Sequence, residues 1–154
     1  MEAMVRSFLK RGIRATSSHL DTTTVLDGLD FRFVGLYASP IPNTIWQIAE
    51  HMHLWVTLKV DMFDGKKIKM PEGHGFGTDA APASEKKWEQ FKVEFKAALI
   101  RMEEMVETMD LEKRYPEWDN LPFAEIVGIM HSHNSYHAAQ IVAMRRVLGV
   151  WSRS

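Results

Sequence analysis

PFAEIVGIMHSHNSYHAAQIVAMRRVLG, residues 122–149, places an apolar residue or a histidine at every third or fourth position. The members of this stripe are Ile126, Met130, His133, His137, Ile141, Met144 and Leu148. That period is typical of an α-helix with one buried face. Pro122 is tolerated in the first turn of a helix, and Gly149 favours a helix end. The stretch therefore predicts a long helix whose buried face carries a pair of histidines.

Two other segments show helical periodicity. One begins near Thr44, which forms a capping-box pattern with Gln47, and it ends near residues 64–65. Its apolar stripe consists of Ile45, Ile48, Met52, Trp55 and Met62. The other begins near Ser84, and its stripe consists of Trp88, Phe91, Phe95, Leu99, Met102, Val106 and Met109. These patterns predict two more long helices.

A fourth helical element has to come from the first forty residues. Asp21 is a candidate cap for a short helix through TTTVLDGL, residues 22–29, and FRFVGLY, residues 31–37, is a weaker segment. We therefore predict an all-α fold, a four-helix bundle that spans residues 1–154 as a single domain. Residues 65–83 hold four glycines and two prolines and predict a long loop, and loops of this length are often lids.

Composition excludes several classes of function. The 19 basic and 20 acidic residues leave a net charge of −1, without the basic surplus that attracts nucleic acid. No stretch approaches the roughly 18 apolar residues needed to cross a membrane, and the charged N-terminus does not resemble a signal peptide. Cysteine is absent, which excludes disulfides and a thiol nucleophile. We expect a cytoplasmic protein with neither nucleic acid nor membrane as a partner.

Three of the seven histidines form a candidate metal site. His133 and His137 are four residues apart, so their rings project from one helix face about 6 Å apart and can share a metal ion. Burying such a pair without partners is costly, which a metal would offset. His51 borders the buried face of its own helix and could supply a third nitrogen. The alternative is a pair of core histidines bonded to carbonyls or carboxylates.

The remaining histidines have weaker claims on the site. His53 and His131 are each about 200° around the helix from their candidate neighbour, so we expect them to face outward or to support the ligands. His74 stands among the loop glycines and could reach the metal as part of a lid. His19 precedes a candidate helix start, where a turn or capping role is expected.

Two motifs resemble those of a known family. TIWQIAEHMHLW, residues 44–55, and HSHNSYHAAQIVAMRRVLGVW, residues 131–151, are similar to the metal-binding motifs of the DinB-like, YfiT-like helical bundles. In the first motif aromatic residues lie five before and four after the ligand, as Trp46 and Trp55 do around His51. The second motif is matched at His133, Tyr136, His137, Gln140, Arg145 and Gly149. Ala139 stands where the family usually has glycine.

The resemblance implies a four-helix bundle, often a homodimer, with one nickel, zinc or iron ion on three histidines and open positions for water. Trp55, Tyr136 and Gln140, together with His74, are then expected near the ligands or in the pocket. Some relatives activate a low-molecular-weight thiol in transferase or isomerase reactions. Others carry only the label of a metal-dependent hydrolase.

Three functions remain open at this point: a thiol-dependent transferase, a metal-dependent hydrolase, and a non-catalytic protein that binds a metal or small molecule under stress. A hydrolase usually needs a general base beside its metal. Glu50 points about 100° away from His51, and Asp21 or Glu125 would serve only if the fold brought them in. The missing base favours thiol transfer to a small-molecule substrate.

Overall fold

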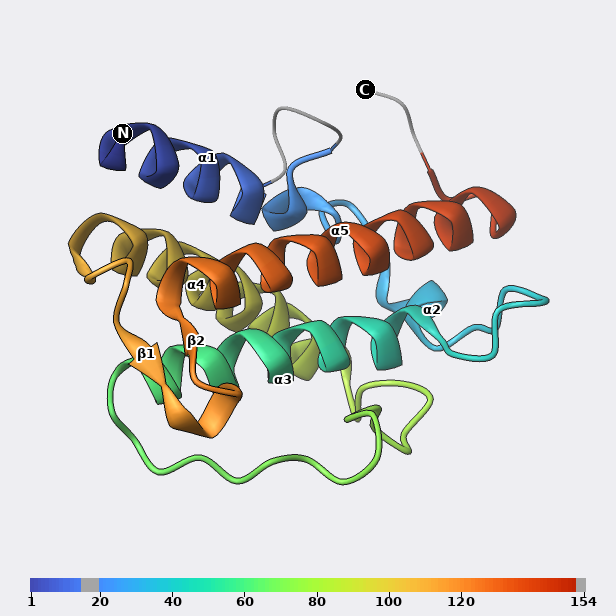
Figure 1. Ribbon diagram of the computed structural model, residues 1–154. Coiled ribbons are helices and arrows are strands. Elements are labelled where there is room, and N and C mark those ends of the chain that lie inside the picture. Colours follow the sequence, from blue (N-terminus) through green and yellow to red (C-terminus); the bar gives the residue numbers. More distant parts are fainter. Residues whose placement is uncertain (15–19, 152–154) are drawn as a thin grey trace.

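The computed structural model describes residues 1–14 and 20–151, and in them five α-helices surround a common core (Figure 1). The helices are α1 (Glu2–Arg14), α2 (Phe31–Val34), α3 (Ile45–Phe63), α4 (Glu85–Thr108) and α5 (Phe123–Val147). Two 3₁₀ turns, η1 (Thr22–Thr24) and η2 (Pro116–Trp118), and two short antiparallel strands, β1 (Arg114–Tyr115) and β2 (Leu121–Pro122), complete the described elements. This mostly helical architecture confirms the all-α expectation.

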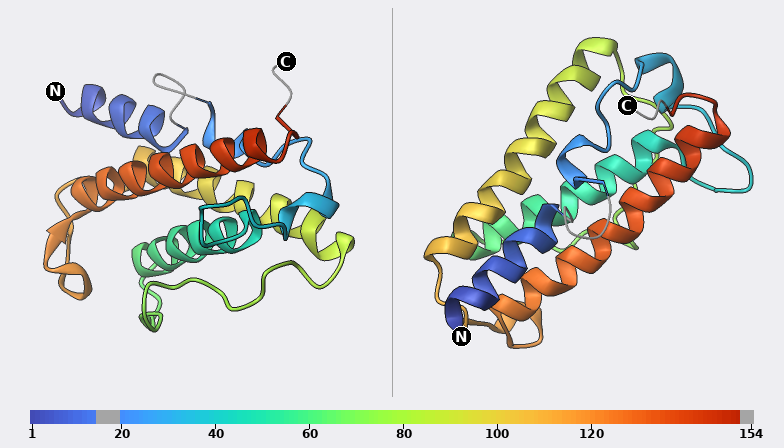
Figure 2. Two further views of the ribbon diagram at one scale, coloured as in Figure 1. Left: turned by 90° about the vertical axis from the view of Figure 1, so that its right-hand side faces the viewer. Right: turned by 90° about the horizontal axis from the view of Figure 1, so that it is seen from above.

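The four long helices pack side by side. Helix α1 contacts α4 and α5, and α3 contacts the same two helices, so that α1 lies diagonally across from α3 (Figure 2). Their apolar stripes meet in one core, in which Trp88 and Phe95 are almost completely buried. Burial of such large aromatic side chains supplies much of the driving force for folding. Within the described residues, none of the helices combines the length and the apolar character needed to span a bilayer.

The predicted helix starts at Thr44 and Ser84 are confirmed. Thr44 Oγ1 accepts from the backbone N–H of Gln47 at 3.2 Å, and the Gln47 side chain accepts from the backbone N–H of Thr44 at 3.0 Å. This reciprocal pair is a capping box. Ser84 Oγ accepts from the backbone N–H of Lys87. Pro122 is the cap of α5 rather than a member of its first turn.

The fourth long helix differs from the expectation, because it is α1 at the start of the chain. Helix α1 is amphipathic, but its buried face holds only Leu9, Gly12 and Ile13, too few apolar positions to form a long stripe. Asp21 caps only the 3₁₀ turn η1, and the FRFVGLY segment forms only the single turn α2. The expectation for His19 concerns a residue outside the described part of the chain.

The predicted loop of residues 65–83 runs along α3 before the chain enters α4 (Figure 1). It is attached to the start of α3 by two hydrogen bonds, from Thr44 Oγ1 to the carbonyl of Ala80 and from Gln47 Nε2 to the carbonyl of Gly77. Gly75 has a φ of +74°, and a Cβ there would lie 3.0 Å from Leu54 Cδ2. Glycine at this position therefore allows the loop to approach α3 closely.

Candidate metal centre

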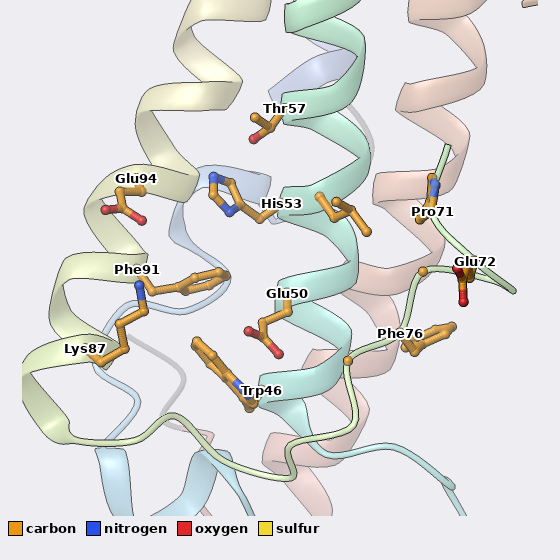
Figure 3. A pocket seen from close by; sticks show the side chains of 13 residues that line it. Trp46, Glu50, His53, Thr57, Pro71, Glu72, Phe76, Lys87, Phe91 and Glu94 are labelled. Atoms are coloured by element: carbon orange, nitrogen blue, oxygen red, sulfur yellow. The ribbon is translucent and has the colours of Figure 1, made fainter. Parts of the chain in front are cut away.

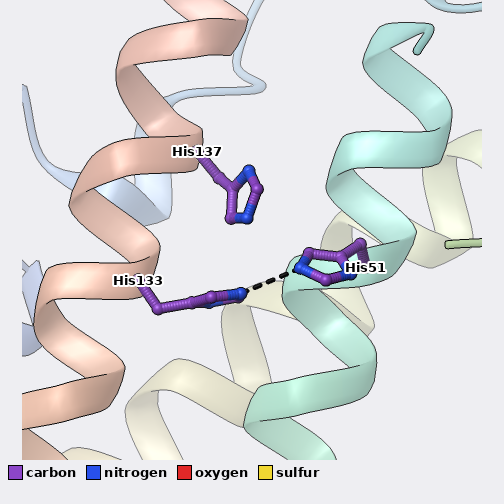
Figure 4. Close-up of side chains that lie close together, drawn as sticks. All are labelled: His51, His133 and His137. Carbon is purple, nitrogen blue, oxygen red and sulfur yellow. Dashed lines mark hydrogen bonds between the residues drawn. The ribbon is translucent and has the colours of Figure 1, made fainter. Parts of the chain in front are cut away.

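Three imidazoles meet between α3 and α5 (Figure 4). His51 comes from α3, and His133 and His137 come from consecutive turns of α5. The Nε2 atoms of His51 and His133 are 2.9 Å apart, and the candidate ligand nitrogens of the three residues all lie within 4.8 Å of one another. The four-residue spacing in the sequence predicted only that His133 and His137 lie together. The packing of α3 against α5 adds the ring of His51.

The spacing of these nitrogens suits one divalent transition metal ion. Metal–nitrogen bonds of about 2.0–2.1 Å place two ligand nitrogens about 2.9 Å apart at octahedral angles and about 3.3 Å apart at tetrahedral angles. The His51–His133 separation is close to the lower value. Three neighbouring histidines, two of them buried and the third half-buried, can therefore hold a metal ion.

Hydrogen bonds orient both α5 histidines for this role. His137 Nδ1 lies 2.7 Å from Gln140 Oε1, and His133 Nδ1 lies 3.3 Å from Asn134 Oδ1. An amide oxygen only accepts, so each Nδ1 carries the ring proton and each Nε2 keeps its lone pair. Metal-ligating histidines are held by such partners on the nitrogen that does not bind the metal.

His51 adds a second argument for a cation between the rings. Its Nδ1 is buried and makes no hydrogen bond with any described residue. If His51 donated Nε2–H to His133, the lone pair on Nδ1 would be stranded; if the proton sat on Nδ1, two Nε2 lone pairs would face each other at 2.9 Å. Either arrangement costs free energy. A metal ion bound by both Nε2 atoms removes the conflict.

The surroundings keep the three imidazoles neutral. Burial, together with the nearby His137 and His133, lowers the pKa of His51 to about 4, and backbone groups of Gly75 and His74 oppose the shift. Burial is also the main cause of the lowered pKa values of His133 and His137. Neutral imidazole is the form that binds a metal, so the site is ready to do so at neutral pH.

The histidines open onto a cavity of about 520 Å³ between α3, α5, η2 and the 65–83 loop. Its walls are largely apolar or aromatic, and they include Trp55, Phe76, Trp118, Ile129 and Met130. The Phe76 ring stacks on His51, with centroids 4.0 Å apart and planes within 6° of parallel. None of the described residues that line this cavity is acidic.

The residues expected around the ligands occupy different positions. Trp55 lies in the cavity wall, 6.2 Å from the His51 ring, and its Nε1 donates to the carbonyl of His74 at 3.4 Å. His74 lines the same cavity, as expected of a pocket residue, but it lies outside the group of three histidines. Gln140 contacts His137 directly and donates to Tyr136 Oη, while Tyr136 is largely exposed and does not line the cavity.

The acidic residues considered as bases lie elsewhere. Glu50 lines a second cavity of about 530 Å³, which shares Phe76 with the first (Figure 3). His53 lies in the same second cavity with its ring 5.3 Å from that of Phe91, so it is half-buried between helices rather than a simple surface histidine. Asp21 caps η1, and Glu125 is exposed in the first turn of α5.

Lys59 is a feature of the site that sequence reasoning missed. It lines the cavity from α3, has 0% exposure, and its ammonium lies against the face of Trp118 and 5.3 Å from the centre of Trp55. Burial lowers its pKa to about 7. The stripe of α3 has a step of seven residues between Trp55 and Met62, and Lys59 lies within that step, four residues after Trp55 and three before Met62. A lysine at a position of the apolar stripe was the feature of the sequence that could have indicated a buried cation.

Comparison of the chain with models of protein families, with curated proteins and with solved structures found no match. Its function therefore has to be inferred from the three histidines and the cavity onto which they open.

Proposed function

We propose that this chain is a metal-dependent enzyme of the DinB-like four-helix-bundle class. One nickel, zinc or iron ion on His51, His133 and His137 would serve the transfer of a low-molecular-weight thiol to a small-molecule substrate. The observation that carries the proposal is the group of three neutral imidazoles whose candidate ligand nitrogens lie within 4.8 Å of one another at the edge of an apolar cavity. The packing of four long helices and the contact of Gln140 with His137 support the assignment to this class.

An enzyme fits the ligand set better than a structural metal site does. Structural zinc sites are usually closed by four protein ligands, whereas catalytic sites combine three with an open position. Among the described residues, no fourth histidine, cysteine or carboxylate joins the group. The open side faces the cavity, where a small molecule has room to bind.

The charge of the metal ion and the lack of a carboxylate in the described cavity favour thiol transfer over hydrolysis. A divalent ion held by three neutral imidazoles would keep its charge of +2, which would favour the thiolate form of a small thiol. In the transfer, the thiol proton passes to solvent and the sulfur forms a bond to an electrophilic carbon of the substrate. The leaving group departs with the electrons of the bond that breaks. No carboxylate lines the described cavity to serve as the general base that a hydrolase usually uses.

The test is to load the protein with cobalt and titrate a small thiol such as 2-mercaptoethanol. We expect a sulfur-to-cobalt charge-transfer band, followed by conjugation of an electrophile such as 1-chloro-2,4-dinitrobenzene. Both should disappear in His133→Ala and persist in His53→Ala. Ester or amide turnover that depends on His133 would instead identify a hydrolase. If neither thiols nor hydrolysable substrates perturb the metal, a non-catalytic protein that binds a metal or small molecule in a stress response is the better assignment.

A further inference from the structure

One face of α3 carries both His51 and a buried cation. His51, Trp55 and Lys59 follow one another at intervals of four residues and all line the same cavity. Eight residues of helix span about 12 Å, so the histidine and the lysine stand at separate points along the cavity wall. Lys59 is still close enough to His133 to contribute to the lowering of its pKa. The two positive centres of the site, metal and ammonium, would therefore face the same cavity.

The Lys59 ammonium has no compensating anion. Its Nζ is buried and makes no hydrogen bond within the described part of the chain, and none of the ion pairs there includes it. The indole faces of Trp118 and Trp55 offer cation–π contact, which offsets only part of the cost of burying a charge. Burial accordingly lowers its pKa to about 7. An anionic ligand would restore the missing partner.

We propose that Lys59 binds the carboxylate of a small substrate whose other end reaches the three-histidine site. The substrates would then be carboxylic acids with an apolar or aromatic body. This inference rests on the metal-dependent function proposed above and adds a substrate class to it. The apolar body would lie against Trp55, Phe76 and Ile129, which line the cavity together with Lys59.

The neighbouring cavity differs from this one in the charge of the residues that line it. It has nearly the same volume, about 530 Å³, but Glu50, Glu72 and Glu94 line it with only Lys87 as a cation. Anions are therefore repelled from that cavity and attracted to the one that holds Lys59. The two cavities have nearly equal volumes, so a ligand cannot be selected by size alone. The opposite charges of their lining residues would direct an anionic ligand to the cavity that holds Lys59.

The probe is 4-phenylbutyrate, with 4-phenylbutan-1-ol as its uncharged analogue, titrated into metal-loaded protein by calorimetry. We expect the acid to bind about 10- to 100-fold more tightly than the alcohol, the range of a hydrogen bond to a charged group. Lys59→Met should abolish this preference, and Lys59→Arg should retain most of it. Lys92→Met is the matched control, because Lys92 also lies over a tryptophan but pairs with Glu89 and does not line the cavity.

Three outcomes overturn the inference: equal binding of acid and alcohol by the wild type, an acid preference that survives in Lys59→Met, and an equal loss in Lys92→Met. The second outcome would mean that the carboxylate binds to the metal alone. If Lys59→Met does not fold, Lys59→Gln replaces it, because this variant keeps a polar side chain but no charge and should also lose the preference for the acid. Elemental analysis of the same samples tests the proposed function separately. Protein that binds no metal would contradict that function, whatever the result at Lys59.

Discussion

His51 and His133 face each other through Nε2 atoms that lie 2.9 Å apart, although 82 positions of sequence separate the two residues. The first belongs to α3 and the second to α5, so only the packing of the two helices creates the contact. Two basic nitrogens at this distance need a proton or a cation between them. The geometry therefore gives a physical reason for the site to bind a metal, and this reason does not rest on the resemblance to a family.

Metal content is the most direct prediction. Protein purified without chelator should contain about one divalent transition metal ion per chain, measured by elemental analysis. His51→Ala, His133→Ala and His137→Ala should each deplete the metal, because each variant leaves only two nitrogens. His53→Ala and His131→Ala are the matched controls and should retain most of it. Full occupancy in His137→Ala would contradict the ligand assignment.

Gln140 should increase the metal affinity of the site without being a metal ligand itself. Gln140→Leu removes the oxygen that lies 2.7 Å from His137 Nδ1, so the imidazole loses the partner that holds its orientation. We expect metal affinity to fall by about 10- to 100-fold, the usual effect of losing such a partner, when measured by competition with a chromophoric chelator. Tyr136→Phe removes only the exposed hydroxyl that accepts from Gln140, and its affinity should stay close to that of the wild type.

The stability of the metal-free protein should depend on pH in the acidic range. His51 takes a proton near pH 6.5 in the unfolded chain but only near pH 4 in the folded one. Between these values the unfolded state binds more protons, so the free energy of unfolding falls as the pH drops from 6.5 towards 4. Urea denaturation at several pH values measures this slope. It should become shallower in His51→Phe; an equally steep slope in that variant would exclude His51 as its cause.

The 65–83 loop offers a test of close packing against α3. Gly73 and Gly75 both have positive φ values, but only at Gly75 would a Cβ meet neighbouring atoms, namely Leu54 Cδ2 at 3.0 Å and Trp55 Nε1 at 3.3 Å. Gly73→Ala should cost about 1–2 kcal/mol of backbone strain. Gly75→Ala should cost more, because the loop must also shift away from α3. Thermal denaturation compares the two, and equal losses would mean that the loop does not pack closely there.

A homodimer is the predicted assembly. The resemblance to DinB-like bundles motivates it, and α1 carries exposed apolar side chains, Met4 at 67% and Phe8 at 58% exposure, which an interface would cover. Trp151 is not part of this exposed surface, because it packs within the chain near the guanidinium of Arg145. Light scattering at micromolar concentration should give about twice the chain mass of 17.7 kDa. A value of one chain mass would refute the prediction.

Much of the local structure could be predicted from the sequence. The stripes of α3, α4 and α5 repeat over many turns, and Thr44 and Ser84 mark two of the starts through side chains that cap neighbouring backbone groups. The shared face of His133 and His137 follows from the geometry of a single helix. Helix α1 was not predicted because its buried face holds only Leu9, Gly12 and Ile13, fewer apolar positions than the stripes of the other long helices.

The sequence by itself determined that α3, α4 and α5 form, where α3 and α4 begin, and that two imidazoles project together, because each of these depends on residues within a few turns. Tertiary structure alone decided that His51 faces that pair, that Phe76 stacks on it, and that Lys59 is buried under Trp118 in the same cavity. Periodicity identifies the buried face of a helix but not what lies opposite. The chemistry of this site arises between helices, where only packing determines which side chains meet.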